Sequence, residues 1–197
     1  MFETSTDIIL EGNRVRLTPL TPDHAINLYS ILQDSPKLMQ FSPSVINSIE
    51  TAQEYIRVAL NAKKQGRAYP FAVLESSSQT VLGTTRYGNI SSIHNRLEIG
   101  WTFLNPLVHG TGINTEMKYL MLNHAFEELT CNRVELKTDS RNLQSRKAIL
   151  KLGAKEEGTL RSHTLMSDGY RRDTVYYSIL KGEWPQIKTN LISRIRS

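Results

Sequence analysis

Cysteine, long hydrophobic runs and excess charge of either sign are all scarce in this sequence. Cys131 is the single cysteine among 197 residues, which excludes an intramolecular disulfide and a zinc site built from several cysteines. The longest apolar runs, residues 71–74 and 119–122, are four residues long, whereas a membrane span needs ~18. The first residues lack the basic start and the long apolar centre of a signal peptide, so we expect a cytoplasmic protein.

The net charge is small and unevenly placed. Lys and Arg outnumber Asp and Glu by five, 24 against 19, and residues 181–197 carry three of that excess, with four basic residues against one glutamate. A nearly neutral body with a basic C-terminal tail from about residue 182 argues against a general nucleic-acid-binding surface. The tail either helps an acidic partner to dock or is simply solvated, and solvation is the simpler interpretation.

The remaining composition, 39% hydrophobic and 22% charged residues, is that of an ordinary globular protein. A length of 197 residues suits one domain, spanning residues 1–197. The expected elements are, in order, strand 13–20, a helix opened by Thr21 and Pro22, a helix from Ser48 closed by Gly66, strands 69–75, 80–89 and 95–103, helix 112–129, strand 133–138, helix 142–152 and strands 157–166 and 172–180. This order predicts a single α/β domain with a mixed, mostly antiparallel twisted sheet flanked by helices.

The strand over residues 95–103 has the clearest alternation of apolar and polar residues. Its two faces are Leu97, Ile99, Trp101 and Phe103 on one side and Arg96, Glu98, Gly100 and Thr102 on the other. A glycine inside a strand is typical of a bulge or of a place where another group approaches the backbone closely, so we expect one of these at Gly100.

The segment WTFLNPLVHGTGINTE, residues 101–116, is the most informative for chemistry. A strand ends at Asn105 and Pro106, and a loop with Gly110 and Gly112 leads directly into a helix. A helix start presents free N–H groups and the positive end of the helix dipole to an anion, and glycine allows a phosphate to come close. The segment lacks the Lys of a Walker A loop and the third glycine of a dinucleotide fingerprint. An ordinary glycine turn before a helix remains the alternative.

Several motifs in order extend over nearly the whole chain. They are RLTPLTPDHA, VLGTTRYGNI, RLEIGWTFLNP, HGTGINTEMKYLMLNHAFEEL, NRVELKTDSRNLQSRKAILKLGAKEEGTLR, DGYRRDTVYYSIL and GEW. Together they resemble the Gcn5-related N-acetyltransferase (GNAT) superfamily, in the branch of the ribosomal-protein N-acetyltransferases of the RimJ/RimL type. The resemblance implies a GNAT fold and acetyl-CoA as co-substrate, with its pyrophosphate on the glycine loop.

The resemblance also implies roles for particular residues. The backbone of Trp101, Thr102 and Phe103 would pair with the pantetheine arm, and Asn142 and Ser145 match an N-x-x-S pattern beside the thioester. The pyrophosphate would lie against His109, Gly110, Thr111, Gly112, Ile113 and Asn114. The chain departs from the family pattern at two places: Leu107 stands where a Gln or Arg is frequent, and Ile149 occupies the region where many relatives have a tyrosine acid.

Acetyl transfer to an amine needs a proton acceptor and help for the departing thiolate. Glu98, on the polar face of its strand and at the acidic position of the family's EIGW motif, is the first candidate base. Its alternative role is a salt bridge with Arg96 or another strand. Ser145 is the candidate that hydrogen-bonds the sulfur, with an exposed helix serine as the alternative. Glu116, in the first turn of its helix, is interpreted as stabilising the helix dipole.

The histidines show no metal-ligand spacing, so no metal is expected. Three functions remain open: acetylation of a protein N-terminus, acetylation of a small amine, and a CoA-binding module without transferase activity. We expect an amine acceptor and neither nucleic acid nor membrane as a partner, and formation of a homodimer is left open.

Overall fold

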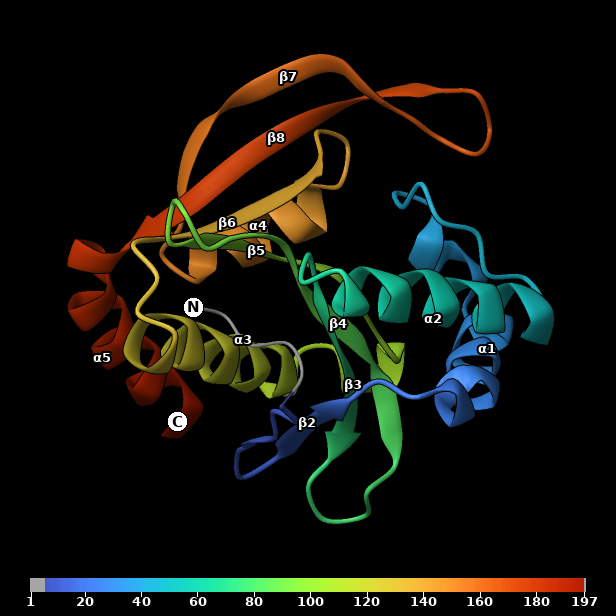
Figure 1. Ribbon diagram of the computed structural model, residues 1–197, viewed down its shortest axis with the longest axis horizontal. Coiled ribbons are helices and arrows are strands. Elements are labelled where there is room, and N and C mark those ends of the chain that lie inside the picture. The colour runs from blue at the N-terminus through green and yellow to red at the C-terminus, as the bar shows by residue number, and fades with distance from the viewer. Residues whose placement is uncertain (1–5, 197) are drawn as a thin grey trace.

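A computed structural model describes residues 6–196, which form an eight-stranded sheet flanked by helices (Figure 1). The strands are β1 Leu10–Glu11, β2 Val15–Pro19, β3 Tyr69–Glu75, β4 Val81–Ser91, β5 Arg96–Leu104, β6 Arg133–Asp139, β7 Lys155–Leu165 and β8 Arg171–Leu180. Their order is β1-β2-β3-β4-β5-β6-β8-β7, and β5 with β6 is the parallel pair of an otherwise antiparallel sheet. The predicted mixed α/β fold is confirmed.

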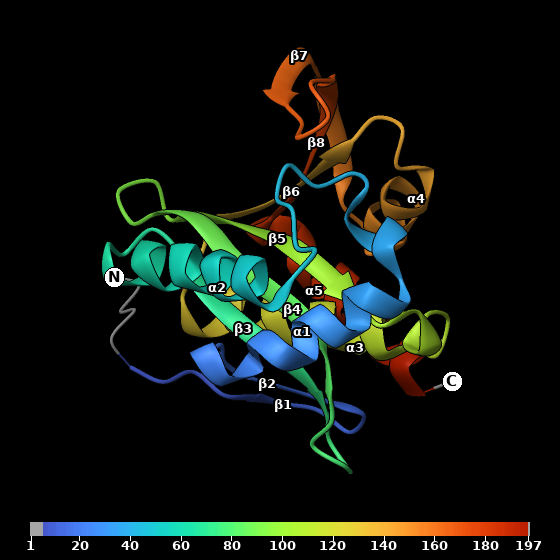
Figure 2. The same ribbon diagram turned by 90° about the vertical axis from the view of Figure 1, so that its right-hand side faces the viewer.

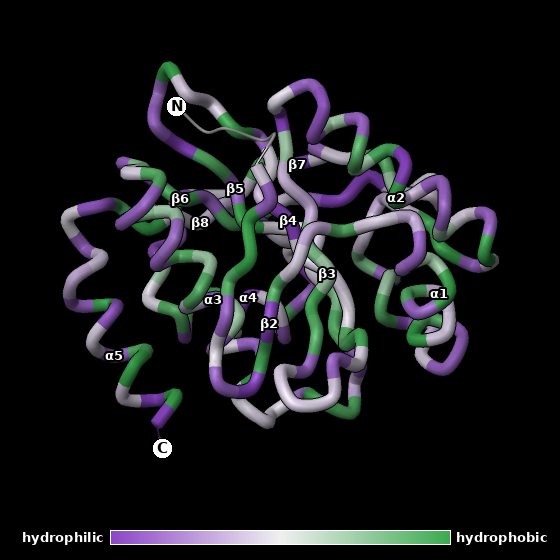
Figure 3. The backbone as a smooth tube through the Cα atoms, turned by 60° about the horizontal axis from the view of Figure 1, so that its bottom comes forward, coloured by the Kyte–Doolittle hydropathy of each residue, from purple (hydrophilic) through white to green (hydrophobic). Residues whose placement is uncertain are grey.

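The helices cover both faces of the sheet. They are α1 Ala25–Asp34, α2 Ile49–Lys64, α3 Ile113–Asn123, α4 Leu143–Lys151 and α5 Trp184–Arg196. Helices α1 and α2 pack on one face over a cluster that includes Leu28 and Phe103, while α3 and α5 pack on the other over a cluster that includes Met117 and Trp184 (Figures 1 and 2). The helices alternate hydrophobic and hydrophilic residues along their length (Figure 3), as expected where only one side is buried.

Local signals place several boundaries where the sequence predicts them. The Ser48 hydroxyl accepts the Thr51 N–H at 3.2 Å and caps α2, which ends before Gly66 at φ +67°. Pro22 opens a 3₁₀ turn, Pro22–His24, that leads into α1. The predicted helix 112–129 is α3 followed by a π-helical turn, His124–Glu128.

Strand β5 loses its alternation at Trp101, where the backbone lies in the left-handed region with φ +51°. The β4–β5 register shifts there, which is a bulge next to Gly100, as expected. Leu97 and Ile99 belong to the α3-side cluster, but Phe103 belongs to the α2-side cluster. The prediction that Trp101 and Phe103 continue the face of Leu97 is therefore wrong, because one extra residue reverses the side on which later side chains lie.

Strands β5 and β6 pair only near their beginnings. The parallel ladder joins residues 96–98 to residues 133–135, and the two strands then continue separately to Leu104 and Asp139 (Figure 2). Beyond Glu98, the β6-facing edge of β5 therefore has no strand partner within residues 6–196. We call this separation the β5–β6 opening. An unpaired strand edge offers N–H and C=O groups to a ligand.

The basic C-terminal segment, expected as a tail, forms helix α5 in the structure. Trp184, Ile187 and Leu191 are buried against the α3 side of the sheet. The Trp184 indole stacks on Phe126 with ring centroids 5.3 Å apart, and its Nε1 donates to Glu127 at 2.8 Å. The segment is thus part of the folded domain, with its charged residues on the outer side.

Over residues 6–196, no helix is both long enough and apolar enough to cross a membrane. The first five residues, which belong to the stretch judged to lack a signal peptide, lie outside the described part of the chain.

Candidate active site

The glycine loop leads into α3 as predicted. Gly110 and Gly112 have φ +80° and +90°, the left-handed region that favours glycine, and Gly112 is the N-cap of α3. The Glu116 N–H bonds back to the Gly112 carbonyl, so the N–H groups of the preceding first turn remain at the open end of the helix. This end is a suitable anion site.

The backbone of this loop is open to an anion, whereas most of its side chains have other contacts. The Thr111 hydroxyl donates to the Val108 carbonyl at 2.8 Å, the His109 ring Nε2 lies 3.1 Å from the Leu104 carbonyl, and Ile113 is buried in the core. The Asn114 side chain is half-buried. Of the predicted cradle, residues 109–114, the main chain and the Asn114 side chain therefore remain available to a ligand.

Arg14 supplies a positive charge beside the loop that sequence reasoning missed. Its Nη1 donates to the Thr111 carbonyl at 3.2 Å and lies where a side chain at Gly112 would stand. Leu107, which replaces the basic or amide residue frequent in relatives, is 87% exposed and takes no part in the site. Because Arg14 lies 97 positions from Thr111, only the fold reveals their contact.

Glu116 stabilises the entry to the loop from inside. Its carboxylate is buried and accepts the backbone N–H groups of Asn13, at 2.5 Å, and Arg14, at 3.3 Å. It fixes the turn between β1 and β2 against α3, close to Arg14. This agrees with a structural carboxylate in the first turn of the helix and gives it no access to a substrate.

Asn142 and Ser145 lie where α4 begins, just after β6. The Asn142 side-chain oxygen accepts the Ser145 N–H at 3.0 Å and caps the helix. The Asn142 carbonyl oxygen is thus committed to the fold, while its amide NH₂ and the half-buried Ser145 hydroxyl have no partner among the hydrogen bonds of the described residues. Both residues border the end of β6 that diverges from β5.

Glu98 is buried, with 2% of its surface exposed, at the point where β5 and β6 part. Its Oε2 accepts from Asn89 Nδ2 at 2.6 Å and forms an ion pair with Lys137 Nζ at 3.0 Å. The expected alternative partner, Arg96, pairs instead with Glu135. Oε1 extends over Gly100, where a Cβ would lie 3.0 Å from it. Glu98 is therefore both part of an ion pair and directed at the bulge of β5.

A pocket of about 670 Å³ opens on the α2 side of the sheet at this point. We call it the inner pocket; its walls include Arg86, Gly88, Asn89, Glu98, Trp101 and Tyr176. The Trp101 indole covers Gly88, where any side chain would collide with the ring. The bulge thus directs the Trp101 side chain into the pocket, where its ring forms a wall beside the β5–β6 opening.

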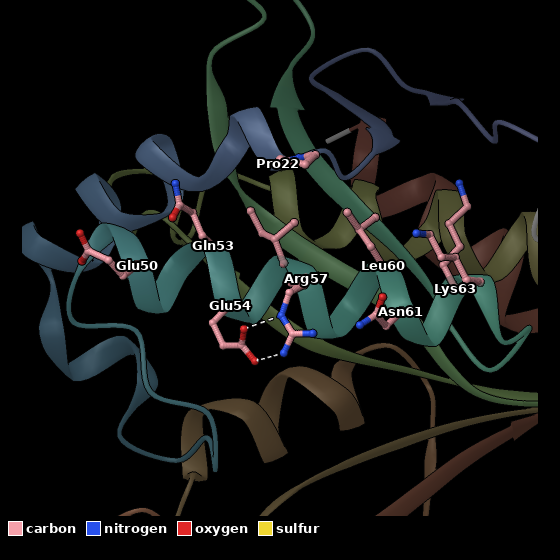
Figure 4. A pocket seen from close by; sticks show the side chains of 10 residues that line it. Pro22, Glu50, Gln53, Glu54, Arg57, Leu60, Asn61 and Lys63 are labelled. Atoms are coloured by element: carbon pink, nitrogen blue, oxygen red, sulfur yellow. Dashed lines mark hydrogen bonds and ion pairs between the residues drawn. The ribbon is translucent and has the colours of Figure 1, made fainter.

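A larger hollow of about 940 Å³ lies along the outer side of α2, from Pro22 to Lys64 (Figure 4). Its wall carries the exposed Glu54–Arg57 ion pair, with Nη2 and Oε1 2.6 Å apart. None of the predicted catalytic or cofactor residues lines it. The inner pocket, which is lined by Glu98 and Trp101, is therefore the candidate site.

Comparison with known proteins decides the family. Residues 14–155 match the family described as "Acetyltransferase (GNAT) domain". The chain belongs to this family. YjcK of Bacillus subtilis (strain 168), named as an N-acetyltransferase, is 34% identical over 162 residues, which are 79% of this chain and 88% of YjcK.

Two further proteins concern the branch and the fold. YdaF of the same organism, named as a ribosomal N-acetyltransferase, is 34% identical over 105 residues, 53% of this chain and 56% of YdaF. Mycobacterium smegmatis RimJ in complex with CoA-disulfide has the same fold, with a TM-score of 0.80, 23% identity, and coverage of 95% of this chain and 93% of RimJ. This GNAT protein is an acetyl-CoA-dependent N-acetyltransferase, and its similarity to YdaF supports the RimJ/RimL-type branch.

The described residues of this acetyltransferase fit its co-substrate. Two glycines hold a left-handed backbone at an open helix N-terminus, which suits a pyrophosphate, and the strand that leads to this loop has an unpaired edge. Within residues 6–196, no group of three or more His, Cys, Asp and Glu side chains could hold a metal ion.

The acetyltransferase also contains a buried lysine that sequence reasoning missed. Lys118 of α3 donates from Nζ to the Thr102 hydroxyl of β5 at 2.8 Å, and that hydroxyl lies 2.7 Å from the hydroxyl of Thr85. Burial lowers the pKa of Lys118 to about 7. In the sequence it lies among the apolar residues of an amphipathic helix, so only its burial distinguishes it from a surface lysine.

A second cluster of charges borders the site from β6, β8 and the segment after α1. The Arg141 guanidinium holds the buried Asp139 carboxylate with two bonds, at 3.0 and 2.7 Å, and stacks over Tyr170. Arg172 is buried and donates to the Phe41 carbonyl at 3.0 Å. This cluster joins the β7–β8 hairpin to the α1–α2 connection, segments far apart in the sequence (Figure 1).

Proposed function

We propose that this enzyme transfers the acetyl group of acetyl-CoA to a primary amine, on a protein N-terminus or a small molecule, by direct attack in a ternary complex. The single observation that carries the proposal is the β5–β6 opening, between the N-terminus of α3 and the inner pocket. One face of the sheet offers an anion site and the other offers a pocket. A donor and an acceptor can therefore meet in the opening from opposite faces.

The main chain of residues 109–114 and the Arg14 guanidinium hold the pyrophosphate in this proposal. Trp101, Thr102 and Phe103 use backbone groups of the unpaired edge of β5 for the pantetheine amides, since the Phe103 side chain is buried in the core. The Asn142 amide NH₂ contacts the same arm. Acetyl-CoA itself supplies an activated acyl group as a thioester.

Glu98 and Ser145 divide the proton chemistry in the proposal. Glu98 accepts a proton from the amine through Oε1, while Asn89 and Lys137 hold Oε2 and stabilise the carboxylate. The Ser145 hydroxyl hydrogen-bonds the departing sulfur. A thiol has a pKa of about 8.5, so its thiolate leaves without a strong acid, and a serine hydroxyl is sufficient.

Release of free thiol from acetyl-CoA in the presence of a panel of amines tests the proposal. The panel contains short peptides with free N-termini, the same peptides with blocked N-termini, polyamines, amino sugars and amino acids. Thiol release with a free amine, and acetylated amine found by mass spectrometry, is the expected result. Calorimetric binding of acetyl-CoA without thiol release for any amine would contradict the proposal and leave a CoA-binding module.

A further inference from the structure

Arg86, on β4, is a buried cation that no carboxylate in the described part of the chain neutralises. It is 6% exposed, and no ion pair joins it to an acidic residue within residues 6–196. Its Nε is fully buried and makes no hydrogen bond. A buried charge without a counter-ion is strongly unfavourable, so such a group is retained for a partner.

Aromatic rings hold the guanidinium of Arg86 in place. It lies 5.3 Å from the Tyr55 ring centroid and 5.1 Å from the Trp101 ring centroid. Burial lowers the pKa of Arg86, and the Tyr55 phenol opposes this effect. The rings fix the orientation of the fork, but a ring face does not replace an anion.

The acidic groups of the inner pocket are already committed to other cations. Glu98 is paired with Lys137, and Glu135 is paired with both Arg96 and Arg133. Within residues 6–196, the walls of the pocket therefore supply no free carboxylate for Arg86. The missing anion must come with a ligand that enters the pocket.

The position of Arg86 connects that ligand to the reaction. Arg86 is the cross-strand neighbour of Gly100, over which the Glu98 carboxylate extends, and Trp101 of the bulge comes next. An anion held by Arg86 therefore lies beside the proposed base and beside the β5–β6 opening. The glycine loop is separated from it, because α3 covers the other face of the sheet.

We infer that Arg86 binds a carboxylate of the acceptor, so that the preferred acceptors are primary amines that carry a carboxylate close to the amine. Arginine matches this group because its planar fork forms two parallel hydrogen bonds with a carboxylate. The carboxylate belongs either to a free amino acid or to the first side chain of a peptide. This inference rests on the proposed function and names the acceptor class for the same site.

Matched acceptor pairs test the inference. Amino acids are compared with their α-amides, and peptides that begin with Glu or Asp are compared with peptides that begin with Gln or Asn. In one of the two series, we expect kcat/KM to be at least tenfold higher for the carboxylate member, and the series that shows the preference identifies the source. Equal rates within every pair would overturn the inference while leaving acetylation of amines intact.

Variants of Arg86 show whether the preference belongs to this residue. Arg86→Met should lower kcat/KM at least tenfold for the carboxylate member and less than twofold for its amide, and Arg86→Lys should restore part of the difference. Arg57→Gln, which removes an exposed cation from α2, is the matched control and should change neither rate. An equal loss on both members in Arg86→Met and Arg86→Lys would show a structural arginine and contradict the inference.

Binding of succinate, a dicarboxylate without an amine, separates this inference from the proposed function. Succinate should change the fluorescence of Trp101 saturably in the wild type and in Arg57→Gln, but not in Arg86→Met, and succinamide should have no effect. If no amine is acetylated while this binding is present, the proposed function fails and the carboxylate site stands. If amines are acetylated and succinate does not bind, the carboxylate site fails and the proposed function stands.

Discussion

Single residues in this enzyme carry roles that depend on backbone conformation more than on side-chain identity. Gly112 has φ +90°, and a side chain there would also meet the Arg14 guanidinium. The side chains of His109, Thr111 and Ile113 have other contacts, so anion binding by this segment would depend mainly on access to its N–H groups. A side chain at Gly112 both strains the backbone and covers the anion site.

We expect Gly112→Val to weaken binding of acetyl-CoA more than tenfold, which corresponds to about 1.4 kcal/mol. The measurement is a calorimetric titration with acetyl-CoA. Gly169→Val is the matched control, because Gly169 has a similar φ of +83° in the β7–β8 turn with nothing near its missing Cβ. It should show similar backbone strain and unchanged affinity. Unchanged affinity in Gly112→Val would contradict the phosphate-loop assignment.

Glu98 and Ser145 should respond differently to pH. Glu98→Gln is expected to lower turnover by roughly 10²–10⁴, the range for loss of a general base, with the defect shrinking as the pH approaches the pKa of the amine. Ser145→Ala should cost about tenfold without that recovery, because it acts on a thiol leaving group with a pKa of about 8.5. pH–rate profiles of both variants on the best amine of the panel measure these effects.

Glu135→Gln is the control for Glu98, since Glu135 lines the same pocket and is paired with two arginines. Any loss of turnover in Glu135→Gln should not shrink as the pH rises, in contrast to the loss expected for Glu98→Gln. A Glu98→Gln profile that runs parallel to the wild type at every pH would show that Glu98 serves only its ion pair with Lys137.

At the scale of elements, helix α3 combines the proposed cofactor-binding end with a buried ionisable group. Lys118 faces the sheet and hydrogen-bonds Thr102 on the strand that borders the opening. Its pKa of about 7, against 10.5 for an exposed lysine, means that the unfolded chain binds this proton more tightly than the folded protein. Folding stability therefore rises as the pH increases from about 7 toward 10.5.

Replacing Lys118 with methionine should remove this pH dependence. At pH 7 and below, where the cost of the buried charge is fully present, we expect the free energy of unfolding to rise by roughly 1–4 kcal/mol. The gain should fade as the pH approaches 10.5. Urea unfolding at pH 6.5 and pH 9.5 measures it, with the exposed Lys147→Met as control. A constant difference at both pH values would refute the titration of a buried lysine.

Helix α5 shows why composition alone misjudges a segment. Its basic residues predict a tail, but Trp184, Ile187 and Leu191 recur at intervals of three and four and form one buried side. The charges lie on the opposite side, where the ion pair between Lys188 and Glu127 is exposed and weakly stabilising. The net charge of a segment does not show on which side of a helix its charged residues lie.

For the whole molecule, regular periodicity predicted the elements and their order well, because each element buries one side. The glycine loop was visible because the φ that it needs restricts the residue type. The bulge at Trp101 was placed only approximately, since a single extra residue leaves no pattern beyond Gly100. The contacts of Arg14, Arg86 and Lys118 could not be predicted, because they join segments far apart in sequence.

The architecture also bears on whether the protein itself carries the acetyl group. Direct transfer needs both substrates together, and in the proposed arrangement each substrate reaches the β5–β6 opening from its own face of the sheet. The alternative requires a nucleophile, and Cys131 is the single cysteine. Cys131 is 5% exposed, and burial raises the pKa of its thiol to about 11. The fraction of Cys131 present as thiolate is therefore about one in ten thousand at pH 7.

We therefore expect a sequential mechanism in which Cys131 is never acetylated. Initial velocities with both substrates varied should give intersecting double-reciprocal lines, and Cys131→Ala should retain turnover within about twofold, because it removes only a small buried group. Mass spectrometry of the enzyme incubated with acetyl-CoA alone should find no acetyl group on Cys131. Parallel lines together with an acetylated Cys131 would contradict the sequential mechanism. They would show that CoA leaves before the amine enters and that the enzyme itself carries the acetyl group in between.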